Sequence, residues 1–129
     1  MGNGTSIGRV RGLGPAHEGA HHWLVQRLTA IGNLVTVLFL IVSLLMLPNL
    51  SYEAVTGWMA QPLPAFMMAL LVVSTFWHAS LGLQVLVEDY VHAPGNRFIV
   101  LALIKIALFS GAAFGLFSIA RLAFSAGAA

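Results

Sequence analysis

The sequence predicts an all-α membrane protein with three transmembrane helices. Of its 129 residues, 59% are hydrophobic and only 8% are charged, whereas a soluble domain carries about 25% charged residues. Three stretches are also apolar over about 20 residues, the length that a helix needs to cross a bilayer. The six basic residues are scattered and too few for a nucleic-acid footprint, and the absence of cysteine excludes disulfides, iron–sulfur clusters and thiolate metal sites on this chain.

The chain begins with a glycine-rich segment, residues 1–20, which lacks an apolar core and precedes the predicted membrane domain, residues 21–122. The first span is expected over about 23–47, where the run of apolar residues is nearly unbroken. Prolines, a glycine and polar residues then predict a loop over 48–64. Within this loop, residues 52–59 could form a short helix at the membrane interface.

The second and third spans follow the same logic. The second is expected over about 65–87 and the third over about 98–120. The connection between them, residues 88–97, contains a Pro-Gly pair that predicts a turn. Residues 123–129 form a short tail without a motif. The predicted architecture is therefore one domain of three helices.

Basic residues near the span ends predict the orientation, because Lys and Arg accumulate in short loops on the inner side of a membrane. Arg9, Arg11 and Arg27 lie before or at the start of the first span, and Arg97 lies in the second connection. Only Arg121 lies at the opposite side. We therefore expect the N-terminus and the second connection inside, and the C-terminal tail outside.

His78 is an imidazole inside the second predicted span. It precedes the inner end of that span by ten residues, or about 15 Å of helix, and so falls near the middle of a hydrocarbon core about 30 Å thick. A histidine there can hydrogen-bond to another helix, relay protons or ligate a metal. Ser74 and Gly82 share its face, and such small residues admit either a flat group such as haem or a second helix.

Asp89 and Tyr90 close the same span. At about 100° per residue, Asp89 lies within about 20° of His78 around the helix axis and about 16 Å further along it. Tyr90 lies about 100° further round, at the inner interface. The pattern fits two sites on one helix, or else an ordinary solvated helix end with a tyrosine of the interfacial aromatic belt.

Two further residues lie at the inner end of the first span. Arg27 follows His21 by six residues, and it either extends to lipid headgroups or, with His21, binds an anion such as a haem propionate or a lipid phosphate. We interpret Lys105 in the third span as a lysine that extends to the headgroups. His17, His22 and His92 are expected to be solvated loop residues.

The stretch "HASLGLQVLVEDY" (78–90) resembles the small cytochrome b membrane anchor of succinate dehydrogenase, the D subunit of respiratory complex II. It carries the pattern H-A-x-x-G, six residues, then D-Y. The stretch "HHWLVQRLTA" (21–30) resembles the entry to the first helix of that family, with a histidine six residues before R-x-T-A. The resemblance covers about residues 19–122 and implies half of a haem-binding bundle built from two anchor chains.

The resemblance also implies roles for particular residues. His78 matches an axial ligand of the iron of haem b, with Ser74 and Gly82 beside it. Tyr90 matches the tyrosine that hydrogen-bonds a ubiquinone carbonyl, and Asp89 the adjacent acidic residue. The groups near the haem propionates correspond to Arg27 and His21.

The implied partners are a larger cytochrome b anchor that supplies the second haem histidine, an iron–sulfur subunit, a flavoprotein subunit and membrane lipid. The chain would not be catalytic alone, and it would carry electrons from succinate oxidation to ubiquinone. A bacterial inner membrane is favoured over the mitochondrial one. Two alternatives stay open: the anchor of a quinol:fumarate reductase, or a structural or transport subunit without haem.

Overall fold

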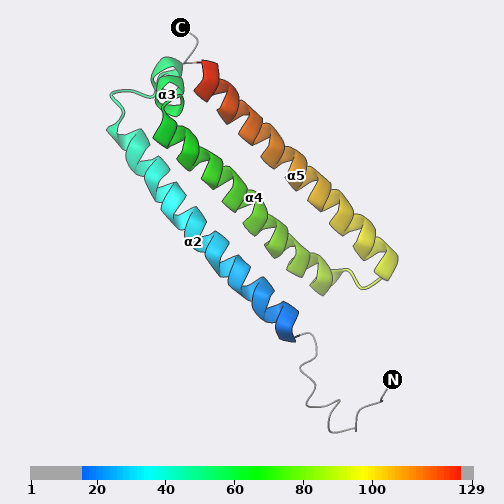
Figure 1. Ribbon diagram of the computed structural model, residues 1–129. Helices are drawn as coiled ribbons and strands as arrows, with labels where there is room; N and C mark the ends of the chain where they lie inside the picture. Colours follow the sequence, from blue (N-terminus) through cyan, green and yellow to red (C-terminus); the bar gives the residue numbers. More distant parts are fainter. Residues whose placement is uncertain (1–15, 126–129) are drawn as a thin grey trace, which may run out of the picture.

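The structure, a computed structural model, describes residues 16–125. It consists of four helices: α2 (Ala16–Met46), α3 (Tyr52–Met59), α4 (Pro62–Tyr90) and α5 (Pro94–Ser125) (Figure 1). The three longest are apolar enough and long enough to cross a membrane, which confirms the predicted fold class. Most of the predicted N-terminal segment and the end of the predicted tail lie outside the described residues.

The three long helices lie side by side, with α4 between α2 and α5 (Figure 1). Neighbouring helices run in opposite directions, so the start of α2, the end of α4 and the start of α5 lie at one end of the molecule. The short helix α3 lies at the other end, where it packs against α4 and α5. We call the end of the molecule that holds the start of α2, the end of α4 and the start of α5 the N-terminal end.

Most apolar side chains point outward, because a single layer of helices encloses very little. Among the described residues, the buried hydrophobic side chains are Ala65, Val87 and Ile119. Large aliphatic and aromatic residues are exposed along all three long helices. In water such a surface would aggregate, and in a bilayer the lipid tails or the helices of another chain cover it. The fold is therefore that of a multi-pass membrane protein.

Small residues on α5 allow it to approach α4 closely. A β-carbon added at Gly111 would lie 2.6 Å from the ring of Phe76, and one added at Gly115 would lie 3.2 Å from Val72. These two glycines are four residues apart and therefore share one helix face. Small residues with this spacing commonly form the contact face between membrane helices. The pair thus explains the packing of α5 against α4.

Prolines set the start of two long helices. Pro62 begins α4 and Pro94 begins α5, since proline has the backbone angle that the first helical turn needs and its missing N–H costs nothing there. The predicted Pro-Gly turn in the second connection was therefore wrong. Helix α4 instead continues to Tyr90, and the connection shortens to Val91–Ala93.

The short helix α3 occurs at the residues where one was considered possible, Tyr52–Met59. Ser51 caps it, because its side-chain oxygen accepts a hydrogen bond from the N–H of Ala54 at 3.3 Å. The ring of Trp58 stacks on Phe39 of α2, with 6.2 Å between ring centroids. These contacts fix the connection between the first two long helices.

Candidate functional site

Polar side chains form a seam between α2 and α4 in the middle of the layer. The hydroxyl of Ser74 donates to the carbonyl oxygen of Thr29 at 2.8 Å, and the hydroxyl of Thr75 donates to the side-chain oxygen of Asn33 at 3.2 Å. The Thr29 hydroxyl oxygen lies 3.1 Å from Nδ1 of His78. Three hydrogen bonds thus join the two helices, as is typical of polar groups inside membrane bundles.

The two helices approach closely at this seam because Gly32 has no side chain. A β-carbon added there would lie only 2.8 Å from the hydroxyl oxygen of Ser74. Beside Gly82, by contrast, a β-carbon would meet nothing within 4 Å. The two small residues on the face of His78 therefore differ. Ser74 contacts α2 of the same chain, whereas the space beside Gly82 is open.

His78 is half-buried within α4, about 24 Å along the helix from its start and about 18 Å from its end. Its Nδ1 is held by Thr29, while Nε2 makes no hydrogen bond with the described residues. Among the side chains of residues 19–125, the one enclosed N or O atom without a hydrogen bond is Nε2 of His22. The Nε2 atom of His78 is therefore not enclosed by the described residues.

Asp89 and Tyr90 lie at the N-terminal end, where α4 finishes. Because α4 runs unbroken from His78 to Tyr90, Asp89 falls on nearly the same face as His78, about 16 Å further along the axis. Both side chains are exposed, and 78% of the Tyr90 surface is accessible. Neither side chain hydrogen-bonds to another described residue, so the phenol and the carboxylate are free to meet a molecule outside the chain.

A cavity of about 570 Å³ lies between the start of α2 and the end of α4. It brings His21 and His22 of α2 together with Gln84 and Glu88 of α4, and the side-chain amide of Gln84 donates to Glu88 at 3.0 Å. The prediction that His17 and His22 lie in a loop was wrong, because both lie in α2. Helix α2 begins at Ala16, which places His22 on a helix facing α4, half-buried.

Arg27 does not line this cavity. Its guanidinium lies over the ring of Trp23, one turn earlier on α2, at 5.3 Å from the ring centroid. Such a cation–π contact contributes about 0.5–1 kcal/mol at an exposed site. The structure thus brings His21 next to α4, whereas Arg27 remains exposed near the same end of the molecule.

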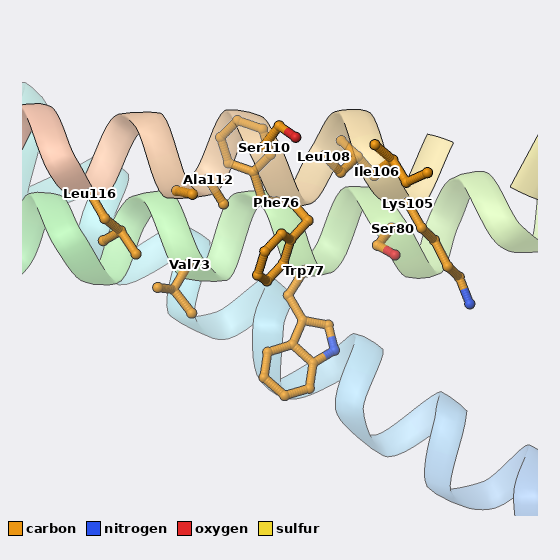
Figure 2. Close-up of a pocket in the computed structure, with 12 residues that line it drawn as sticks. Val73, Phe76, Trp77, Ser80, Lys105, Ile106, Leu108, Ser110, Ala112 and Leu116 are labelled. Atoms are coloured by element: carbon orange, nitrogen blue, oxygen red, sulfur yellow. The ribbon is translucent and has the colours of Figure 1, made fainter. Parts of the chain in front are cut away.

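A second, larger groove of about 790 Å³ lies on the layer between α4 and α5. Figure 2 shows Lys105 at one end of this groove and Leu116 at the other, with Phe76 and Trp77 between them. Its lining is almost entirely apolar apart from Lys105, Ser80 and Ser110. Trp77 lines both this groove and the smaller cavity between α2 and α4, whereas Ser80 lines only the groove.

Thr29 is the threonine of the R-x-T-A pattern, but that pattern alone does not show that it contacts His78. A signal is nevertheless present, since Thr29, Asn33 and Thr36 recur at intervals of three or four residues along an otherwise apolar helix. This spacing places them on one face of α2, and polar residues on one face of a membrane helix usually meet another helix. The pattern predicts the polar seam, although not which residues of α4 it meets.

The fold and the seam define a class, that of multi-pass helical membrane proteins with polar and ionisable groups inside the bundle. The sequence matches the family described as "Succinate dehydrogenase/Fumarate reductase transmembrane subunit" over residues 1–114, and the chain belongs to this family. It is accordingly a membrane-anchor subunit, which confirms the resemblance found in its second-span and first-span motifs.

Similar proteins are named as membrane anchors of succinate dehydrogenase. The chain is 31% identical to the succinate dehydrogenase hydrophobic membrane anchor subunit of Rickettsia bellii (strain RML369-C) over 106 residues, which cover 82% of this chain and 83% of that protein. It is 34% identical over 82 residues to the protein of that name from Paracoccus denitrificans, with 63% of each chain covered.

Proposed function

We propose that this chain is one of two membrane anchors of a succinate:quinone oxidoreductase, that His78 holds haem b, and that Tyr90 and Asp89 line a ubiquinone site. The observation that carries the proposal is the state of the His78 ring. Its Nδ1 is engaged by Thr29, whereas its Nε2 has no partner among the described residues and is not enclosed by them. A ring held on one side and open on the other is the arrangement that an axial ligand requires.

The residues around His78 fit a haem. The face beside Gly82 is open to a flat group, and one imidazole per chain suffices when a larger cytochrome b anchor supplies the second axial histidine. Arg27 and His21 lie nearer the N-terminal end of α2 and would pair with the haem propionates, since charged hydrogen bonds to carboxylates are strong. When bound, the haem supplies a one-electron carrier inside the membrane.

The Tyr90 phenol would donate a hydrogen bond to a quinone carbonyl oxygen, where negative charge grows during reduction. The Asp89 carboxylate, next to it in the sequence, would orient the quinone or pass a proton to it. Both groups are exposed at the end of α4, so a quinone in the surrounding bilayer, or between this chain and a partner, can reach them. Quinone reduction would therefore occur at the N-terminal end of the bundle.

The similar bacterial proteins are named as anchors of succinate dehydrogenase, and this supports the succinate-oxidising direction. The bacterial sources of these relatives favour a bacterial inner membrane, and the basic residues near the span ends favour an N-terminus on its inner side. Succinate oxidation and the iron–sulfur chain would belong to a flavoprotein subunit and an iron–sulfur subunit, because this chain has no cysteine. The N-terminal end of the bundle would face these subunits and membrane lipid would surround the rest.

The haem assignment is tested by His78→Leu in the assembled complex, with His92→Leu as the matched control. His92 is an exposed histidine in the connection after α4, so its loss should leave haem binding intact. We expect His78→Leu to remove the b-type band from the reduced-minus-oxidised spectrum while the chain still enters the membrane. A band of normal intensity in His78→Leu would show that the ligand lies elsewhere.

The quinone assignment is tested by Tyr90→Phe, with Tyr52→Phe as the control. The chain has two tyrosines, and both are strongly exposed, at 78% for Tyr90 and 81% for Tyr52. Tyr52 begins α3 and Tyr90 ends α4, and Figure 1 shows α3 and the end of α4 at opposite ends of the layer. We expect Tyr90→Phe to slow quinone reduction by about 10²-fold and to spare succinate oxidation by a soluble acceptor. An equal loss of both activities, or an equal effect of Tyr52→Phe, would contradict the assignment.

A further inference from the structure

Two threonines of α2 differ in one respect that concerns His78. The hydroxyls of both Thr29 and Thr36 lie within hydrogen-bonding distance of carbonyl oxygens of the preceding turn: 2.9 and 3.0 Å for Thr29, and 2.8 and 3.2 Å for Thr36. Only Thr29 also reaches across to α4, where Nδ1 of His78 lies 3.1 Å from its oxygen. The Thr36 hydroxyl hydrogen-bonds only to carbonyl oxygens of its own helix.

The hydrogen count at Thr29 limits the arrangements that its hydroxyl and His78 can share. A threonine hydroxyl has one hydrogen to give and two lone pairs with which to accept. When the hydroxyl donates to the carbonyl oxygen of Val25 or Gln26, its oxygen meets Nδ1 with a lone pair, and Nδ1 carries the hydrogen of that bond. When the hydroxyl donates to Nδ1 instead, the hydrogen of the ring lies on Nε2.

The tautomer with hydrogen on Nε2 makes one hydrogen bond fewer. In that tautomer the Thr29 hydroxyl would have to turn from its carbonyl partner to donate to Nδ1. Nε2 has no partner among the described residues in either tautomer, so the difference is the lost hydrogen bond, which is worth about 0.5–1.5 kcal/mol. The contact geometry therefore favours hydrogen on Nδ1 and a free lone pair on Nε2.

We infer that Thr29 is a positioning residue for haem: it accepts the Nδ1–H of His78, fixes the ring and keeps Nε2 available to the iron. The inference rests on the proposed role of His78 as axial ligand. The position of Thr29 is itself held, because Ser74 donates to its carbonyl oxygen at 2.8 Å. A hydrogen bond of this kind also makes the imidazole a stronger electron donor, which stabilises the oxidised iron.

The test compares three variants in the purified complex. Thr29→Val keeps the shape but removes the hydroxyl, Thr29→Ser keeps the hydroxyl, and Thr36→Val removes the matched hydroxyl that does not touch a histidine. We expect Thr29→Val to weaken haem retention by about 10- to 100-fold and to raise the midpoint potential of the haem. Thr29→Ser and Thr36→Val should resemble the wild type in both measurements.

Equal behaviour of Thr29→Val and Thr36→Val would overturn the inference. If Thr29→Val does not assemble, a second measurement tests the inference. ¹⁵N NMR of the haem-free, full-length wild-type chain in bilayers shows directly which nitrogen of His78 carries the hydrogen. Hydrogen on Nδ1 of His78 is the expected result, and hydrogen on Nε2 would overturn the inference. If His78→Leu retains its haem, the proposed function fails. If His78→Leu loses haem while Thr29→Val matches the controls, only the role of Thr29 fails.

Discussion

Gly32→Ala should disturb the candidate haem site without changing any residue that touches a ligand. The added β-carbon would lie 2.8 Å from the Ser74 hydroxyl, whereas ordinary contact begins at 3.4 Å, so α4 must retreat by about 0.6 Å or Ser74 must turn away. A retreat of that size lengthens the 3.1 Å contact between Thr29 and His78 to about 3.7 Å, beyond the range of a good hydrogen bond. Overpacking of this kind costs about 1–3 kcal/mol.

The assay is unfolding of the full chain in mixed micelles containing SDS, combined with the haem content of the assembled complex. Gly57→Ala is the control, because a β-carbon there meets nothing within 4 Å and the change brings only the helix preference of alanine, about 0.5–1 kcal/mol. Gly32→Ala should be about 1–3 kcal/mol less stable than this control and should hold less haem. When Ser74→Ala is added to Gly32→Ala, the crowded oxygen is removed, and part of the lost stability and part of the lost haem should return. A Gly32→Ala chain as stable as Gly57→Ala and with full haem content would refute the reasoning.

Two further predictions concern the packing of the remaining helices. Gly111→Ala should cost about 1–3 kcal/mol, because its β-carbon would lie 2.6 Å from the Phe76 ring; Phe76→Leu should recover part of this loss in the same unfolding assay, and independent effects of the two changes would argue against the contact. Ser51→Ala should weaken α3 by about 0.5–2 kcal/mol through loss of its cap, seen as faster hydrogen exchange at the amide of Ala54, and unchanged exchange there would count against the cap.

The number of spans could be predicted because hydropathy over about 20 residues is a strong signal. The ends of the helices were predicted less accurately than the number of spans. Helix α2 begins at Ala16, seven residues before the expected start of its span at Trp23, and α5 begins at Pro94 rather than Phe98. Composition detects the apolar core of a helix, whereas the helix itself continues into the interface for as long as its backbone hydrogen bonds are satisfied.

The candidate site was predicted only in part, for a physical reason. The position of His78 within its span follows from the sequence, since it depends on distance along a single helix. The contact with Thr29 depends on the register of α2 against α4, which is set by the close approach of Gly32 and Ser74. His22 illustrates the same limit, because only the packing of α2 on α4 shows that its ring is half-buried. Helical phase within one segment is readable, but the pairing of two segments requires the structure.

The most direct test of the account is a density map of the assembled complex at a resolution that shows the haem and its ligands. We expect haem iron bonded to Nε2 of His78 on one side and to a histidine of the larger anchor on the other, with Nδ1 of His78 within hydrogen-bonding distance of the Thr29 hydroxyl. Iron bonded to another residue of this chain, or a complex in which His78 contacts no haem, would contradict it.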